Sequence, residues 1–570
     1  MRKRPYIPPS RSFSALIVAT VTGPSAPHRT RPVRPPTLGT PMSDTSAAPR
    51  GSLPLGTLLA GCLAVCLAQI GLAMPATLNG LFQEHLRPVG SQLTWISDAF
   101  LLPVAVLELS FGVLGDLFGR KRLLVGGAAL LCAGEVVAAT ATGIHQLWTG
   151  QALAGLGAAA LFPTSLAMIA AGTRTGAQRA RSIALWASSL SAGGFLAPLI
   201  GGITGTYGSW RSAFVVVVVL AAVSALVSGL LATDSRSPEG RSLDIGGQLA
   251  IGVGLFALLY AVIQGPEDGW GSAPVVVAFV LAAVFLALFL AAERRARSPL
   301  LRLELFRNRS FAVASVVAVV GMFSFLGTAY AASIRLGPIQ HQSPMRTAFA
   351  FLLLNAITPA LTPLTSRLLH RLHARVLLTG GLALMAAGDF LAATLDVDDR
   401  ALTSLILPLG LVGCGFALTV SSITATAVNT VPVPLAGMAS AATNLLRDFG
   451  FTLGPAVIGA VALSQAASRV SGTLAGASSL DAESRAAAHE VLAEGGPLAL
   501  NSVPASSPPG AARAYALDAL GHGYGIGFVV CGGAALLAAL LVATALRGRK
   551  AETGPEDPLL DDHHSAPVTS

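Results

Sequence analysis

The stretch GVLGDLFGRKR, residues 112–122, decides how this chain folds. It is a short charged turn between two apolar runs, each long enough to cross a lipid bilayer. Its glycines let the backbone turn sharply and pack closely, and its acidic residue is followed by three basic ones. Because basic residues beside a membrane span are typical of the cytoplasmic side, we expect a cytoplasmic turn. The residues that define it are Gly112, Gly115, Asp116, Gly119, Arg120 and Lys121.

The composition places most of the chain in a membrane. Of its 570 residues, 53% are hydrophobic and only 11% are charged, and the mean hydropathy is +0.67. A soluble domain carries charge on about a quarter of its residues. The apolar residues also gather in runs of about 20, the length that a helix needs to cross the hydrocarbon. We therefore predict an all-α polytopic membrane protein, with the lipid bilayer as its first partner.

The sequence argues against three other classes of protein. The formal net charge is +9, but the basic residues lie in short loops between apolar runs, so we expect no nucleic acid partner. No G-x-x-x-x-G-K-[ST] phosphate loop occurs, so we expect no nucleotide partner. No nucleophile–base pair or metal-ligand cluster lies at membrane depth, and all five cysteines lie in apolar runs. We therefore expect neither an enzyme nor a bound cofactor or metal.

Fourteen apolar runs predict fourteen membrane helices, six on each side of a central pair. Most loop Lys and Arg residues fall on one side of this arrangement, which places both termini in the cytoplasm. The sequence leaves open whether the natural chain starts at Met1 or Met42. The expected divisions are a disordered cytoplasmic tail (1–52), a six-helix bundle (53–233), a two-helix insert with flanking cytoplasmic linkers (234–309), a second six-helix bundle (310–547) that contains a mobile external loop (466–523), and a disordered cytoplasmic tail (548–570).

An internal repeat indicates that the two bundles are related. GGAALLCAGE (Gly126–Glu135) aligns without a gap with GGLALMAAGD (Gly380–Asp389), and each opens the third helix of a six-helix set. A second similarity pairs Pro198 in the fifth span with Pro455 in the thirteenth. Parallel halves that hold a substrate between them near the membrane midplane are a common plan of transporters.

Several motifs resemble those of the major facilitator superfamily, in its fourteen-spanner drug:proton antiporter branch. GVLGDLFGRK is similar to the family pattern G-x-L-x-D-R-x-G-R-K, with Leu117 at the arginine, and APLIGG is similar to G-P-x-x-G-G, with Ala197 at the first glycine. The stretches GLGAAALFPTSLAMI, GSWRSAF, LDIGG and AERRARSPLLRLELFRNRSF also resemble the branch. The resemblance implies a major facilitator fold, alternating access, and export of a small organic compound driven by protons.

Two positions depart from this branch. Its usual membrane aspartate in the first span falls on Cys66, and the functional arginine of the fourth span falls on Gln151. Both family groups are implicated in proton coupling, so we do not expect coupling by the usual residues.

Five carboxyl groups inside the predicted spans are the candidates for proton coupling, because an intramembrane charge is costly and commonly functional. Glu108 lies about 12 Å from Asp116 along its helix, well inside the hydrocarbon, and we favour it. Asp98 lies near the outer boundary and is either an external-gate acid or a helix N-terminal cap. The candidates are Asp98, Glu108, Glu135, Asp389 and Asp448.

Three of these carboxyls have alternative roles. Glu135 and Asp389 hold matching places in the repeat and could form symmetric helix–helix hydrogen bonds, while Glu135 could also share a proton with Glu108. Asp448 follows Arg447, and we interpret these two residues mainly as a self-neutralising latch between the bundles.

Family analogy places a substrate cavity on spans one, four, nine and twelve. A polar residue there either contacts the substrate or makes a hydrogen bond within the helix packing. The cavity candidates are Gln69, Gln151, Tyr330 and Asn429, with Ser421, Ser422 and Thr424 beside them. At the interface between bundles, small residues and prolines allow close approach or a bend. The interface candidates are Pro198, Gly201, Gly202, Arg447 and Pro455.

We therefore predict a monomeric secondary active transporter of the plasma membrane, with the turn at 112–122 as its cytoplasmic gate. It is expected to export a small organic compound, uncharged or cationic, by alternating access with the proton gradient as energy source. One alternative is an uncoupled facilitator or importer, which the residues at positions 66 and 151 would suit. The other is a non-transporting membrane receptor on the same fold.

Overall fold

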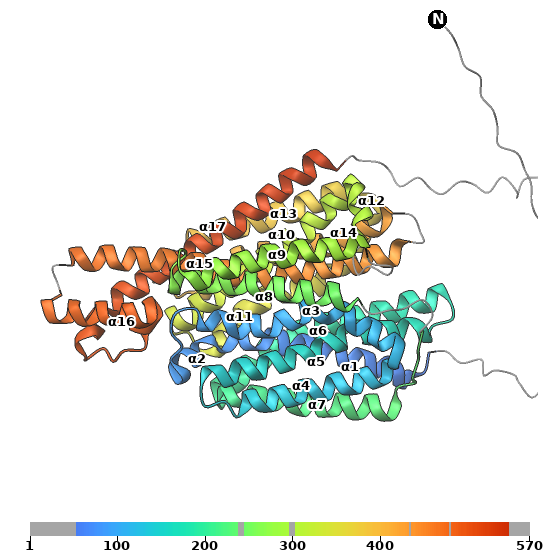
Figure 1. The fold of residues 1–570 in the computed structure, drawn as a ribbon, viewed down its shortest axis with the longest axis horizontal. Helices are drawn as coiled ribbons and strands as arrows, with labels where there is room; N and C mark the ends of the chain where they lie inside the picture. Colours follow the sequence, from blue (N-terminus) through green and yellow to red (C-terminus); the bar gives the residue numbers. More distant parts are fainter. Residues whose placement is uncertain (1–52, 238–243, 296–301, 432–434, 478–479, 547–570) are drawn as a thin grey trace, which may run out of the picture. The chain divides into compact units, whose positions relative to one another are not determined.

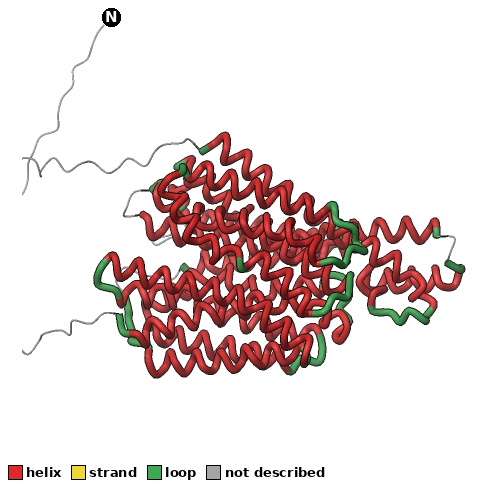
Figure 2. The backbone as a smooth tube through the Cα atoms, turned by 180° about the vertical axis from the view of Figure 1, so that it is seen from behind, coloured by secondary structure: helices red, strands yellow, loops and turns green. Residues whose placement is uncertain are grey.

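The computed structural model describes residues 53–237, 244–295, 302–431, 435–477 and 480–546, and every regular element in these ranges is helical (Figure 1, Figure 2). The α-helices are α1 (Leu55–Ala73), α2 (Asn79–Leu86), α3 (Gln92–Phe118), α4 (Arg120–Ala139), α5 (Ile144–Gly172), α6 (Gly176–Tyr207), α7 (Trp210–Leu231), α8 (Ile245–Asp268), α9 (Ala273–Arg295), α10 (Arg309–Ile334), α11 (Pro344–Asn355), α12 (Ile357–Arg371), α13 (Ala374–Ala393), α14 (Leu402–Asn429), α15 (Ala436–Gly476), α16 (Ala482–Asn501) and α17 (Arg513–Ala545). Short helical turns at Met74–Leu78, Leu303–Arg307, Arg335–Ile339 and Pro508–Ala512 adjoin them.

Fourteen helical spans among the described residues are long and apolar enough to cross a bilayer. A helix satisfies its own backbone hydrogen bonds, which is the requirement that lipid imposes on a spanning segment. The first span combines α1, the turn Met74–Leu78 and α2, and the tenth combines α11 with the start of α12. The all-α membrane fold and the number of spans predicted from the sequence are confirmed.

The spans pack as two sets of helices (Figure 1). The first set is α1–α7, and the second set is α10–α15 with α17. Helix α8 packs against α9 and also against α3 and α15, one helix of each set. Because successive spans run in opposite directions, every loop lies at one of two ends. We call the end that holds the α3–α4 turn the turn end, and the opposite end the α16 end.

The glycines of the internal repeat serve the same packing role in both sets. A Cβ at Gly134 of α4 would lie 2.6 Å from the Gly150 carbonyl oxygen of α5. A Cβ at Gly388 of α13, the matching repeat position, would lie 2.5 Å from the Pro408 carbonyl oxygen of α14. A side chain cannot fit at either place, because the two backbones approach too closely. The repeat therefore encodes the contact between the third and fourth spans of each set.

Residues 466–523 differ from the mobile loop expected from their composition. Helix α15 continues to Gly476, α16 follows, and α17 begins at Arg513. The alanine-rich composition that we interpreted as a loop also favours a helix. With 41 residues, α15 is about 60 Å long, twice the thickness of the hydrocarbon. Figure 1 shows α16 and the adjoining ends of α15 and α17 projecting beyond the two sets, and we call residues 480–512 the α16 segment.

Candidate functional site

The turn between α3 and α4 is closed by an ion pair and by the chain that leaves α7. Asp116 Oδ1 accepts hydrogen bonds from Arg120 Nη2 and Nε at 2.6 and 3.1 Å, and both side chains are largely buried. The Arg120 amide donates to the Ser235 carbonyl oxygen at 3.1 Å, and the Ser237 amide donates to the Asp116 carbonyl oxygen at 3.1 Å. The turn is therefore bound to residues that follow the last helix of its own set.

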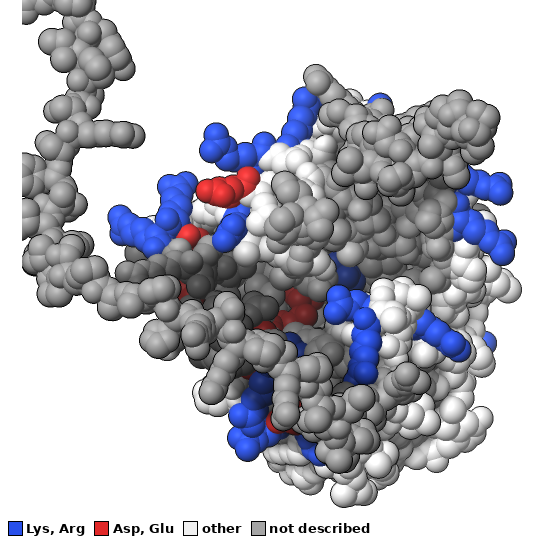
Figure 3. Space-filling model, turned by 90° about the vertical axis from the view of Figure 1, so that its right-hand side faces the viewer, with Lys and Arg blue, Asp and Glu red and all other residues white. Residues whose placement is uncertain are grey.

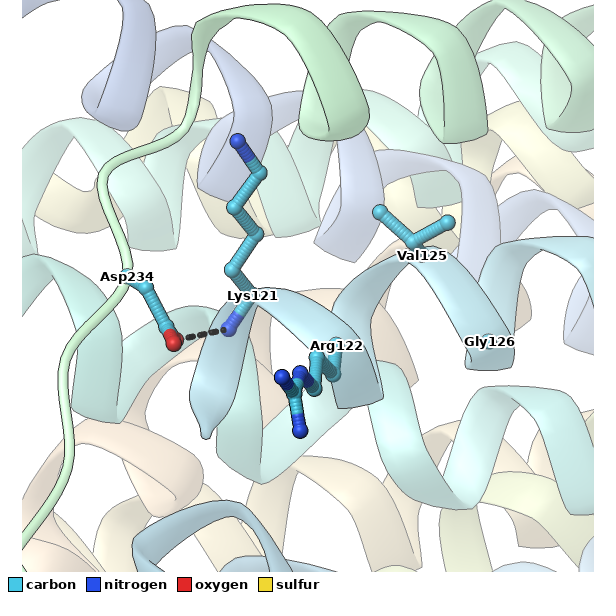
Figure 4. Close-up of a pocket in the computed structure, with 5 residues that line it drawn as sticks. All are labelled: Lys121, Arg122, Val125, Gly126 and Asp234. Carbon is cyan, nitrogen blue, oxygen red and sulfur yellow. Dashed lines mark hydrogen bonds between the residues drawn. The ribbon is translucent and has the colours of Figure 1, made fainter. Parts of the chain in front are cut away.

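Gly119 has a backbone conformation that this turn requires. Its φ is +108°, a region that other residues rarely adopt. A Cβ there would also lie 2.9 Å from the Asp234 carboxylate. The Asp234 Oδ1 instead accepts a hydrogen bond from the Lys121 amide at 3.2 Å (Figure 4).

An open groove of about 480 Å³ lies beside this turn and is lined by Lys121, Arg122, Val125, Gly126 and Asp234. Figure 4 shows the Lys121 and Arg122 side chains extending in different directions. They do not converge on one point, so the groove offers no focused site for an anion.

A charged cluster joins the two sets of helices at membrane depth. Glu108 of α3 and Asp448 of α15 lie within hydrogen-bonding reach of each other, and the Arg447 guanidinium lies close to both carboxyls. A hydrogen bond between two carboxyl groups requires that one of them holds a proton. Two carboxyls at this separation can share one proton, at a point where the first set meets the second. The Glu108–Glu135 pairing that we considered from the sequence is not formed, because neither Glu135 oxygen has a hydrogen-bond partner among the described residues.

Asp98 lies within α3 and not at its start. The helix begins at Gln92, so the interpretation of Asp98 as an N-terminal cap is wrong. Its side chain is fully buried, and neither carboxyl oxygen has a hydrogen-bond partner in the described part of the chain. One turn away along α3, Thr94 Oγ1 lies 2.7 Å from Tyr330 Oη of α10. Asp98 therefore sits beside a contact between the two sets.

Glu135 and Asp389 face the first helix of their own sets. Asp389 Oδ1 and Oδ2 accept hydrogen bonds from Thr328 Oγ1 at 2.5 Å and Ser324 Oγ at 3.1 Å, both on α10. The Glu135 carboxyl lies beside α1, where its Oε1 is 3.3 Å from the place that a Cβ of Gly71 would take. The two carboxyls thus hold matching positions, but the hydrogen bonds that we expected at both are made at Asp389.

The predicted cavity residues fall in different environments. Gln69 is half-buried on α1 and lies near Gly194 of α6. Gln151 is buried, and its Nε2 has no hydrogen-bond partner among the described residues. Tyr330 is buried in the contact with Thr94, whereas Asn429 is exposed at the last residue of α14, at the turn end.

The predicted interface residues of α6 lie at the α16 end. A Cβ at Gly201 would overlap Thr77 Oγ1, and one at Gly202 would lie 2.6 Å from the Ala348 Cβ of α11, in the second set. Pro198 is buried one turn earlier. Pro455 is buried on α15, where the neighbouring Gly454 packs against the α10 backbone.

The α16 end is closed by contacts that the sequence did not reveal. Asn79 Nδ2 donates to Ser333 Oγ at 2.8 Å, and Ser333 Oγ donates to the Ala76 carbonyl oxygen. A Cβ at Gly337 would lie 2.7 Å from the Gly80 amide nitrogen, so these two backbones touch. A polar residue such as Asn79 at the end of an apolar span was the available signal, but its partner is 254 residues away.

Comparison with known proteins identifies the architecture. Residues 59–455 match the family model of the Major Facilitator Superfamily. The chain belongs to this superfamily. Like its other members, it is a membrane transporter and not an enzyme.

Curated members of the superfamily resemble the chain in sequence. It is 34% identical over 369 residues to the multidrug resistance protein Stp of Mycobacterium tuberculosis (strain CDC 1551 / Oshkosh). The aligned region covers 65% of this chain and 68% of Stp. It is 28% identical over 526 residues to the tetracenomycin C resistance and export protein of Streptomyces glaucescens. The aligned region covers 91% of this chain and 96% of that protein.

Solved structures show that the fold is shared. An auto-inhibited POT family peptide transporter superposes with a TM-score of 0.58 at 15% identity, over 88% of this chain and 99% of that one. A bacterial homologue of the human lysosomal transporter Spinster, inward-facing and unoccupied, superposes with a TM-score of 0.57 at 15% identity. The superposition covers 86% of this chain and 98% of that one.

Proposed function

We propose that this superfamily member is a proton-coupled exporter of small organic compounds in the plasma membrane, that it works as a monomer by alternating access, and that its turn end faces the cytoplasm. The names of its relatives support export of drugs and antibiotics. Figure 3 looks onto the turn end, where Lys and Arg side chains are more frequent than Asp and Glu among the described residues. Such an excess of basic residues is typical of cytoplasmic loops.

The observation that carries the coupling proposal is the carboxyl pair of Glu108 and Asp448. With one shared proton, the pair has a single negative charge, which Arg447 neutralises. Without that proton, the cluster carries a net negative charge inside the membrane, where charge is costly. Loss of the proton therefore favours separation of α3 and α15 or the arrival of a cationic compound. Either response changes the relative free energies of the inward-open and outward-open states.

The other candidates have supporting roles in this proposal. Asp98 is an acid of the outer gate, reached from outside once the Thr94–Tyr330 contact opens. Asp389 holds the third span of the second set against α10 through two hydrogen bonds, and Glu135 takes the matching place beside α1. Gln69 and Gln151 line the substrate path, while Asn429 at the exposed end of α14 is assigned no contact with substrate.

Transport by inverted membrane vesicles tests the proposal. We expect an acid vesicle interior to drive accumulation of a cationic dye such as ethidium, and a protonophore to abolish it. Glu108→Gln and Asp448→Asn keep the side-chain shape but cannot release a proton, so each should lose the gradient-driven component. Glu483→Gln removes an exposed carboxyl from α16 and is the matched control.

An uncoupled facilitator is the second candidate, because Cys66 and Gln151 occupy the positions of the usual coupling groups. Its signature would be dye movement at equal rates with and without a pH gradient, in the parent protein and in Glu108→Gln alike.

A further inference from the structure

The α16 segment is a covalent part of the second set, because it connects α15 to α17. It nevertheless makes polar contacts with the first set as well. Gln83 of α2, which is 4% exposed, donates through Nε2 to Ser502 Oγ at 2.7 Å and to the Leu498 carbonyl oxygen at 3.4 Å. The Gly90 amide, between α2 and α3, donates to the Gly495 carbonyl oxygen at 2.9 Å.

The backbone of both partners is shaped for this contact. Helix α16 is broken at Gly496, which has φ +66° and ψ −171°, and Gly90 opposite it has φ +50°. A Cβ at Gly495 would lie 2.9 Å from Val89, and a Cβ at Gly90 would overlap the Glu267 carboxylate. Gly90 combines a positive φ with little space beside Glu267, and the φ and ψ of Gly496 lie in a region that other residues rarely adopt, so glycine is required on both sides of the contact.

On its other side, the α16 segment holds the second set near the end of α10. Asn501 Nδ2, in a residue that is 4% exposed, donates to the Pro338 carbonyl oxygen at 2.6 Å. Arg513 Nη2 donates to Asn501 Oδ1 at 3.2 Å and to His341 Nε2 at 3.0 Å. Pro338 adjoins Gly337, and Gln83 follows Gly80 by three residues. The segment therefore spans the Gly80–Gly337 contact that closes the α16 end.

We propose that the α16 segment is an outer lock, whose bonds to Gln83 and Gly90 hold the α16 end closed and break each time the transporter opens outward. The orientation of this end and the need for outward opening rest on the proposed function. Movement of the first set away from the second stretches the bonds of Gln83 and Gly90, whereas the bonds of Asn501 and Arg513 stay within the second set. Opening thus requires release on one side of the segment only.

Cross-linking across the two kinds of contact tests the lock. In full-length protein with its five cysteines replaced by alanine, Gln83→Cys with Ser502→Cys joins the segment to the first set. Arg469→Cys with Asp518→Cys, at an ion pair of 3.2 Å between α15 and α17, joins two parts of the second set and is the matched control. After treatment with a reducible bifunctional thiol reagent, we expect the first pair to lose dye export and to recover it on reduction. The control pair should export at the parent rate throughout. Full export by the fully cross-linked first pair would overturn the proposal.

A second measurement does not depend on export. A cysteine introduced at Ser333, inside the closed contact, reports opening through its rate of modification by a membrane-impermeant maleimide. We expect Gln83→Ala to raise this rate several-fold. Ser507→Ala, which removes a hydrogen bond made inside the α16 segment, should not change it. Equal rates in both variants would contradict the lock, whereas absence of export by the unmodified parent would contradict only the proposed function.

Discussion

The two ends of the helices are held together in different ways. At the α16 end, the bonds of Asn79, Thr94 and Gln83 run from the first set to the second set or to the α16 segment. At the turn end, the hydrogen bonds that we describe for Arg120 and Lys121 run to the α3–α4 turn itself or to residues 234–235, within the first set. The difference teaches that the turn at 112–122 stabilises one set of helices. Closure between the sets depends on residues of the α16 end that, apart from Gly202 of APLIGG, lie outside any motif.

The largest effect is expected on the free energy of unfolding, from the ion pair in the α3–α4 turn. Arg120→Ala removes the guanidinium from the buried carboxylate of Asp116 and should lower the free energy of unfolding by about 3 kcal/mol. Arg122→Ala, at an exposed position two residues away, should change it by less than about 0.5 kcal/mol. Thermal unfolding of the two purified variants in detergent provides the comparison. Equal midpoints would show that the ion pair does not support the first set.

A smaller effect is expected at the α16 end, on conformation and not on folding. Asn79→Ala removes one buried hydrogen bond between the sets, worth about 1 kcal/mol, so the ratio of outward-open to closed molecules should rise about fivefold. Spin labels at Tyr207 and Asp398, one on each set, report this ratio as a distance distribution. Thr140→Ala, which removes bonds within the first set only, is the control. A distribution unchanged by Asn79→Ala would mean that the Asn79–Ser333 bond does not hold the end closed.

The smallest effect concerns His341, whose contact with Arg513 lies within the second set. Burial, with Arg513 and Arg400 nearby, lowers the pKa of His341 below its usual 6.5, although Glu84 and Asn501 oppose this shift. The folded protein therefore favours the neutral ring, so this contribution to the free energy of unfolding is complete above about pH 6.5 and is lost as the pH falls below that value. Because the Arg513 contact persists when the α16 end opens, the open fraction should not follow this titration. Thermal unfolding between about pH 7.5 and 5.5 should show the loss in the parent and not in His341→Gln, and identical pH profiles for the two would refute a role for His341.

The sequence predicted features that are local or repeated. Runs of about 20 apolar residues gave the fourteen spans, because span length is set by the bilayer. The repeat that ends at Glu135 and Asp389 gave the relation between the sets, because its glycines make the same close contact twice. The meeting of Glu108 with Asp448 was not predicted, since they are 340 residues apart and no local pattern connects them. Residues 466–523 were mistaken for a loop because alanine, serine and glycine are common both in loops and in closely packed helices.

Gradient-driven transport in inverted vesicles, with Glu108→Gln beside the parent protein, tests the central claim most directly. The account predicts that an acid interior accelerates ethidium accumulation by the parent at least about tenfold, and that Glu108→Gln loses this acceleration while the protein still inserts in the membrane. Equal acceleration in the parent and in Glu108→Gln would contradict coupling through the Glu108–Asp448 pair.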